Sequence, residues 1–453
     1  MGSARFRAAI QALRGEELTA LIAEAAPGEA APDLDMQALA ALAKALLGRT
    51  DEALREAAAA RAQAITAGSP AVVCDMASVR ALATATLGDL VGATELARRA
   101  SMMSRTEALR EQETLANLVL ARVRRLTGRP FLATRILGAL ARFSSPAWRP
   151  WLDWEHTMAS GALTAVASDD DDAAASLSRA LDLARAGDRP GFEGALDRSL
   201  ARARGLAGHV ADLHAVRVAL DPDADAGPRD GPLARFRAGL DHEVPFGLLG
   251  LTASPDQDEA AVLVLARPGR CGARLLGPGA PLAEAAGALR LPQSQRRQGR
   301  TDTALAVLAL AGPDGLPDDQ LFRAAYGFAF SHNVHGGVLD VLLHRARAHL
   351  GDTGGITRSR GVLTLALARP LLLVDPRGAP HDDDRVLQLV ARCGRMSAKD
   401  TSQQLGLPLR SAQAALEALV ATGACTRERN GRAIEYRVDD TTFQEPTDQQ
   451  GKR

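Results

Sequence analysis

The sequence predicts a mainly α-helical protein: an N-terminal α-solenoid with a period of about forty residues, followed by two small α+β modules. Small residues recur in register through the first half, and two later segments each place apolar helices before a β-hairpin signal. A chain of 453 residues with 46% hydrophobic content can supply several domains with cores. The expected repeat domain, linker, middle module with preceding strands, C-terminal module and disordered tail are residues 1–218, 219–240, 241–375, 381–443 and 444–453.

The register pairs a glycine or serine with an alanine five positions later. The pairs are Gly48/Ala53, Gly88/Ala93, Gly128/Ala133 and Ser168/Ala173, and Gly208 continues the glycine series. A glycine ends one helix or eases the turn into the next, and a small side chain lets two helices approach closely. The register therefore predicts four or five stacked helix pairs.

This register resembles the tetratricopeptide repeat family, whose helix pairs place Leu-Gly late in one helix and Ala early in the next. Leu47-Gly48 and Leu87-Gly88 match that pattern. Most of the family's aromatic positions are not matched, and the period is longer than the family's 34 residues, which requires longer helices or loops. The resemblance implies a concave surface that binds a protein or peptide partner. The alternative is a plain α-solenoid that acts as a spacer or dimerisation arm.

The charge balance excludes a global attraction to nucleic acid or membrane. Fifty-four basic residues balance fifty-four acidic ones, so a DNA-binding surface must be local. The sequence has no apolar run of membrane-spanning length and no signal-peptide core, which predicts a cytoplasmic protein without membrane partners. The low aromatic content and the excess of Arg over Lys indicate a bacterial origin.

Metal-ligand spacings are missing from the polar clusters. The cysteines lack CxxC or CxxH spacing, so we expect buried, reduced thiols at Cys74, Cys271, Cys393 and Cys425. The run from Asp169 to Asp172 lacks the alternation of a calcium loop and is expected to be a solvated turn. The histidines of 332–349 form no i, i+4 pair, which favours ordinary helix and loop positions. We expect no cofactor.

The middle module begins with two apolar strands within 260–276, which a Pro-Gly turn joins. Residues 301–367 then predict a helix, a Pro/Gly break, a short helix, a loop, a longer helix and a hairpin. The hairpin strands carry Ile356 and the apolar run Val362–Leu367.

This segment is similar to the effector domain of the OmpR/PhoB response-regulator family, a winged helix. Leu321 to Gly327 matches its second-helix motif, with Tyr326 in the aromatic place. The resemblance implies a recognition helix that begins near His335, and the candidate DNA contacts are His335, Arg345, Arg347, Arg358 and Arg360. Gly336, Gly337 and Asp340 depart from that role, and five arginines face six aspartates over 301–367. The alternative is a module that docks a protein instead of DNA.

The C-terminal module carries the most specific pattern. A helix over 385–394, a short helix capped by Ser397, a longer helix from Leu407 and a hairpin around Asn430-Gly431 follow in order. This strongly resembles the bacterial winged helix-turn-helix repressors and activators. Over 385–438 nine basic residues face four acidic ones, a local surplus that suits phosphates.

The resemblance implies that the longer helix reads DNA. It also implies that the hairpin around Asn430-Gly431, called the wing, contacts the DNA backbone. The candidate DNA-binding residues are Lys399, Arg410, Ser411, Gln413, Ala414, Arg427, Arg429 and Arg432. Arg410 and Gln413 can present donors and acceptors to base edges, and the wing arginines suit phosphates. Winged helices also serve as protein–protein modules, and that alternative stays open.

No nucleotide-binding or hydrolase motif occurs, so we expect no enzymatic activity. The first hypothesis is a transcription regulator that binds double-stranded DNA and docks a partner on its repeats; a homodimer is compatible with it. The second is a non-enzymatic scaffold that uses repeats and winged helices to assemble proteins. Binding of the whole chain to random duplex DNA, measured against salt, separates the two.

Overall fold

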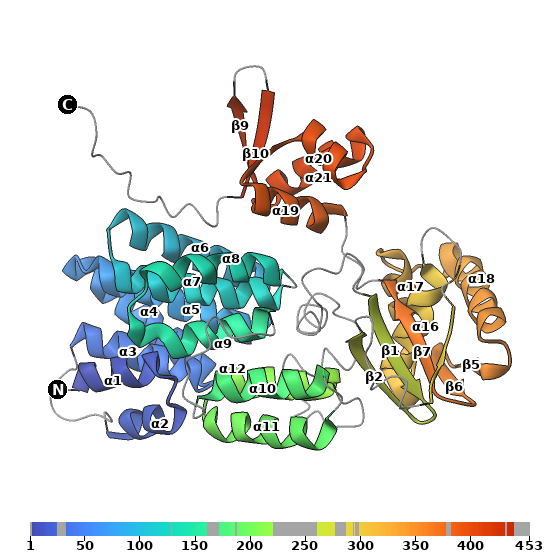
Figure 1. Ribbon diagram of the computed structural model, residues 1–453, viewed down its shortest axis with the longest axis horizontal. Helices are drawn as coiled ribbons and strands as arrows, with labels where there is room; N and C mark the ends of the chain where they lie inside the picture. The colour runs from blue at the N-terminus through green and yellow to red at the C-terminus, as the bar shows by residue number, and fades with distance from the viewer. Residues whose placement is uncertain are drawn as a thin grey trace.

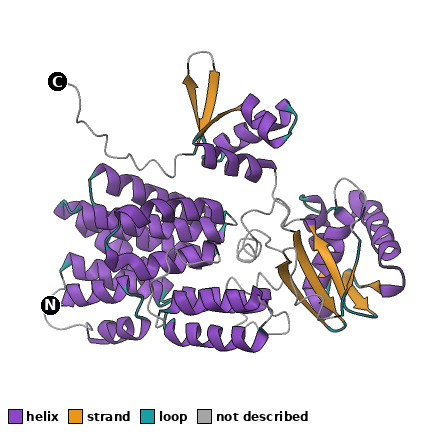
Figure 2. Ribbon diagram, viewed as in Figure 1, coloured by secondary structure: helices purple, strands orange, loops and turns teal. Residues whose placement is uncertain are grey.

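The computed structural model of the chain describes residues 2–24, 33–127, 129–160, 172–185, 188–220, 261–276, 287–292, 294, 299–376, 382–430 and 433–438. The described part is mainly helical, as expected, and its strands all follow residue 260 (Figures 1 and 2). No helix in these ranges is long and apolar enough to cross a membrane.

The N-terminal region consists of helices joined by short turns. Its helices are α1 Gly2–Gln11, α2 Gly15–Glu24, α3 Leu34–Leu46, α4 Thr50–Ala67, α5 Pro70–Thr86, α6 Leu90–Thr106, α7 Arg110–Leu126, α8 Pro130–Phe143, α9 Arg149–Ser160, α10 Ala173–Arg185, α11 Arg189–Arg202 and α12 Ala207–Leu220. From α3 to α8 each helix packs against the next, and α5 also contacts both α3 and α7. This alternation is the arrangement of stacked helix pairs.

The forty-residue register corresponds to real positions in three of these pairs. Ala53, Ala93 and Ala133 lie at equivalent places on α4, α6 and α8, and each is fully buried. Gly48 and Gly88 follow α3 and α5 with φ of 79° and 90°, a left-handed conformation that favours glycine. The small residues therefore mark turns and close helix contacts, as the sequence predicted.

The register fails in the later units. Gly208 lies inside α12, and the glycine with positive φ between α11 and α12 is Gly205. A Cβ on Gly208 would stand 2.5 Å from Nη2 of Arg122. This glycine therefore leaves space for the guanidinium group and does not form a turn. Gly128, Ser168 and Asp169–Asp171 lie outside the described residues, as does the expected linker 219–240 beyond the end of α12.

The middle module (residues 300–367) packs beside a four-stranded sheet. The sheet contains β1 Ala261–Arg267, β2 Arg270–Leu276, β7 Leu371–Asp375 and the short β3 Leu289–Arg290, in the order β2-β1-β7-β3. The predicted turn at Pro268-Gly269 joins β1 to β2, and the antiparallel register pairs Val264 with Ala273. Sequence analysis missed β7, whose five residues are all buried.

Within the module the order is α16 Arg300–Ala311, β4 Leu316–Pro317, α17 Asp318–Tyr326, α18 His332–Leu350, β5 Gly354–Ser359 and β6 Val362–Leu367. The three strands form a sheet in the order β4-β6-β5. Its core contains Leu305, Phe322, Leu339 and Leu363. The predicted helices and hairpin are thus present.

The C-terminal module (residues 382–438) repeats this order. It contains α19 Asp382–Cys393, β8 Arg395–Ser397, α20 Ala398–Leu405, α21 Leu409–Ala421, β9 Thr426–Asn430 and β10 Ala433–Arg437, with the sheet order β8-β10-β9. Ser397 caps α20 as expected, since its Oγ accepts from the Asp400 amide at 3.2 Å. The expected tail 444–453 lies outside the described residues.

The cysteine expectation is partly wrong. Cys74 and Cys425 are buried free thiols, but Cys393 is exposed. Cys393 is the last residue of α19, where the helix leaves the core, so its side chain has no apolar neighbours to cover it. The surroundings of the Cys271 side chain lie outside the described part of the chain.

Candidate nucleic-acid interface

Helix α21 separates its residues into a buried and an exposed face. Ala412, Leu416 and Leu419 recur at helical spacing and pack into the module core. The opposite face of the first two turns is exposed, and it contains Arg410, Ser411, Gln413 and Ala414. The structure therefore places together the four predicted α21 residues, and their amides and guanidinium face outward.

The preceding helix adds one cation near this face. Lys399 is exposed in the first turn of α20. The Ser397 hydroxyl donates to Oδ2 of Asp400 at 2.6 Å, which holds that carboxylate at the start of the helix. Lys399, Arg410 and Arg429 form no ion pair with any other described residue.

The wing is attached to α21 through Glu417. The Tyr436 hydroxyl of β10 donates to Oε1 of Glu417 at 2.8 Å, and Nη1 of Arg427 in β9 lies 3.4 Å from the same oxygen. Burial and the Glu417 carboxylate raise the pKa of Tyr436 to about 12. Arg427 is therefore partly neutralised within the module, whereas Arg429, two residues further along β9, is exposed. Arg432 lies outside the described residues.

Two of the remaining acidic side chains, Glu428 and Glu435, are engaged within the sheet. Nη2 of Arg437 lies 2.9 Å from Glu428, and Arg395 approaches Glu428 and Glu435 at 3.9 Å each. Glu428 and Glu435 are therefore engaged within the sheet, whereas Asp382 and Asp384 of α19 pair with Arg385 and with Arg129. The exposed cations that form no ion pair with described residues include Lys399 on α20, Arg410 on α21, Arg429 on β9 and Arg392 on α19.

In the middle module, three of the predicted contact residues already have partners within the module. The His335 ring stacks on Phe322, and its Nδ1 accepts from the Ser331 amide at 2.9 Å. Nε of Arg347 donates to the Ile356 carbonyl at 2.9 Å, which ties α18 to β5.

Arg358 is the third of these residues. It lies between two carboxylates, with Nε 3.1 Å from Asp318 and Nη1 2.8 Å from Asp340. Sequence reasoning weighed Asp340 but missed Asp318, because the two residues meet only when the hairpin folds over α17. Arg345 and Arg360 are exposed and form no ion pair with described residues.

The exposed residues of α18 include a row of valines beside polar side chains such as His344 and Arg345. Val334, Val338 and Val341, spaced four and three residues apart, have exposed fractions of 70%, 42% and 48%. Valine methyl groups cannot form hydrogen bonds with phosphate oxygens. These three valines therefore offer no phosphate contact on α18.

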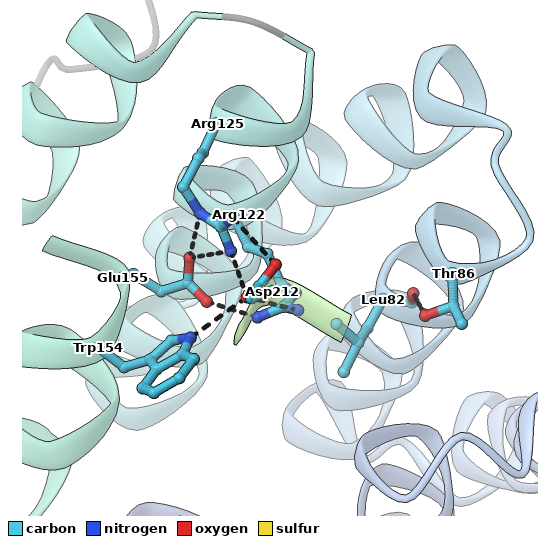
Figure 3. A network of polar contacts seen from close by, with 7 residues as sticks. All are labelled: Leu82, Thr86, Arg122, Arg125, Trp154, Glu155 and Asp212. Atoms are coloured by element: carbon cyan, nitrogen blue, oxygen red, sulfur yellow. Dashed lines mark hydrogen bonds and ion pairs between the residues drawn. The ribbon is translucent and has the colours of Figure 1, made fainter. Parts of the chain in front are cut away.

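A buried charge cluster in the N-terminal region was missed by sequence reasoning (Figure 3). Arg122 and Arg125 of α7 contact Glu155 of α9 and Asp212 of α12, at distances that include 2.8 Å for Arg122–Glu155 and 2.9 Å for Arg125–Asp212. The Trp154 indole donates to Asp212 at 3.3 Å. Burial alone would raise the pKa of Asp212, but the two guanidinium groups hold it below its ordinary value.

The two arginines and two carboxylates balance in charge and are all buried. Each carboxylate is already shared by both guanidinium groups, and the groups are too enclosed to meet a substrate. The cluster therefore joins α7, α9 and α12 as a structural element. The sequence signal was the pair Arg122-x-x-Arg125 directly after the apolar run Leu118–Ala121.

Comparisons of the chain with protein-family models, with curated proteins and with solved structures give no match. Within the described residues, no group of three or more His, Cys, Asp or Glu side chains is placed to hold a metal ion.

Proposed function

We propose that this chain is a cytoplasmic bacterial transcription regulator without enzymatic activity. Its C-terminal module is a winged helix that binds double-stranded DNA, and its α-solenoid of tetratricopeptide-like repeats docks a protein or peptide partner. The order of helices and strands from α19 to β10 supports the winged-helix assignment. The stacked helices α3–α8 support the repeat assignment.

One observation carries the DNA-binding proposal: Glu417, Glu428 and Glu435 are engaged within the module, while Lys399, Arg410 and Arg429 are exposed and unpaired among described residues. Phosphate contacts supply most of the affinity of such modules and depend on cations of this kind. Arg410 and Gln413 occupy the first turns of the proposed recognition helix, from which side chains reach base edges in the major groove.

The test is titration of the whole chain with random duplex DNA at several salt concentrations. We expect measurable binding whose logarithm falls linearly with the logarithm of salt concentration. Replacing all three unpaired cations with alanine should abolish most of this binding. The matched control is Arg142→Ala on α8, since Arg142 is also an exposed cation outside the proposed interface. Binding that is absent, or equally weakened by both changes, would refute the proposal.

The second candidate function is a scaffold for protein assembly. The exposed valines of α18 favour it, together with the internal pairing of Arg358. A scaffold predicts that the chain shows no salt-dependent affinity for duplex DNA. The same titration therefore decides between the two functions.

A further inference from the structure

The C-terminal module contacts the N-terminal region across a defined surface on α6 and α8. Leu132 of α8 is 1% exposed and belongs to the core that also contains Leu387, Val390 and Leu416 of the module. Phe131 packs against the same core. Figure 1 shows α19 beside the end of the helical stack that contains α6 and α8. An apolar side chain from the first region thus completes the core of the last.

Helix α19 is held at both of its ends by α8. Nε of Arg129, just before α8, lies 3.3 Å from Oδ1 of Asp384 in the first turn of α19. Nη1 of Arg135 donates to the carbonyl of Ala391 in the last turn of α19. The six steps from residue 129 to residue 135 rise roughly 9 Å along a helix, and the seven steps from 384 to 391 rise roughly 10.5 Å. The matching spans and the shared direction imply that α8 and α19 run roughly parallel.

A third arginine binds the end of the proposed recognition helix. Nη1 of Arg98 on α6 donates to the Gly423 carbonyl at 2.7 Å, just after α21. Carbonyls at helix C-termini lack intrahelical partners and carry the negative end of the helix dipole. Arg98 and Arg135 therefore stabilise the C-terminal ends of α21 and α19, two elements that must be fixed to orient the reading face.

The docked surface and the proposed reading face lie at opposite ends of α21. Gly423 follows the C-terminal end of the helix, whereas Arg410 and Gln413 occupy its N-terminal turns and remain exposed. Docking on α6 and α8 therefore leaves the proposed DNA-binding residues accessible.

We propose that the face formed by Arg98, Arg129, Leu132 and Arg135 is a docking site for the C-terminal module, and that it fixes the direction of α21 relative to the repeats. This positioning role rests on the proposed DNA-binding function. The contacts combine three arginines with one fully buried leucine. A partner bound to the repeats is thereby held in a fixed direction relative to the proposed reading face.

Docking is tested by hydrogen exchange in the full-length chain, measured on peptides from α19. Arg98→Ala with Arg135→Ala should accelerate exchange in α19 by about tenfold, because docked helices open less often. Arg142→Ala, on the same helix α8, should leave exchange unchanged. Arg129→Asp should also accelerate exchange, and adding Asp384→Arg should restore protection by reversing the pair. Unchanged exchange in the double variant, or acceleration by the control, would overturn the docking site.

Positioning is tested by the affinity of the same double variant for random duplex DNA. We expect it to stay within about twofold of the unmodified chain, because the reading face is already free when docked. A gain of tenfold or more would show that docking hides the face, and would overturn the positioning role. If the unmodified chain does not bind DNA, the proposed function and the positioning role fail together, and the exchange result alone decides the docking site.

Discussion

The middle and C-terminal modules share an order of elements and differ in surface chemistry. Each runs helix, strand, helix, helix, strand, strand, and each places its last strand at the centre of a three-stranded sheet. In the C-terminal module Glu417, Glu428 and Glu435 pair with arginines of the sheet, and cations remain on the exposed helix face. In the middle module Arg358 is paired and the exposed helix face carries valines. Backbone order alone therefore does not determine the ligand.

The comparison is tested first by removing the unpaired cations of each module. In the C-terminal module, Lys399→Ala, Arg410→Ala and Arg429→Ala together should weaken binding to random duplex DNA at least a hundredfold at low salt. The log–log salt slope should fall by about 2.7, since each lost phosphate contact contributes roughly 0.9.

The matched change in the middle module is Arg345→Ala with Arg360→Ala. It should lower affinity less than threefold, because the neighbouring valines give phosphates no donors. Fluorescence anisotropy of labelled duplex measures both sets of variants. Equal losses from both modules would show that the middle module also binds DNA.

The second prediction separates reading from backbone contact within the C-terminal module. Arg410→Ala should lower affinity for a selected site by about 1–3 kcal/mol and relax sequence preference, since its place on α21 reaches base edges. Arg429→Ala should weaken all duplexes alike, because an exposed wing residue meets the backbone. Competition against scrambled duplex gives the ratio of specific to nonspecific affinity for each variant. If Arg429 sets the preference and Arg410 does not, the wing is the reader.

The sequence was sufficient to predict elements defined by local patterns. Apolar spacing located α16–α18 and α19–α21, and Pro268-Gly269 located the turn between β1 and β2. It failed where distant residues meet. β7 joins β1 across about a hundred residues, and Asp318 reaches Arg358 only after the hairpin forms. The contact of Leu132 with the C-terminal core is equally invisible in a local pattern.

The candidate site shows the same division. Helical periodicity was enough to place Arg410, Ser411, Gln413 and Ala414 on one exposed face. It could not distinguish Arg427, which pairs with Glu417, from Arg429, which does not. Both arginines belong to the same strand with the same local charge, and only the fold decides which carboxylate each one meets.

The third prediction concerns the ion pairs that neutralise the arginines. Glu417→Gln removes the charge that faces Arg427 but keeps an acceptor for the Tyr436 hydroxyl. Affinity for random duplex DNA should rise about two- to threefold, because one more wing cation becomes available to phosphates. The corresponding change Asp340→Asn in the middle module should leave affinity unchanged, since Asp318 still holds Arg358. A similar gain from both changes would show that the two surfaces are equivalent.

The smallest effect is a change in the titration of Tyr436. Its pKa is raised to about 12 by burial and by the Glu417 carboxylate, which disfavours a phenolate beside it. Because the folded pKa lies above the ordinary value, the contribution of this group to stability is complete below pH 10 and is lost as pH rises toward 12.

Glu417→Gln removes the charge repulsion and should lower the Tyr436 pKa, which the ultraviolet absorbance of phenolate reports. Tyr326 of the middle module is the other tyrosine of the chain. If the phenolate signal of Tyr436 is unchanged in the variant, Glu417 does not hold the wing against α21. The position of the wing would then be set only by the pairing of β10 with β8 and β9.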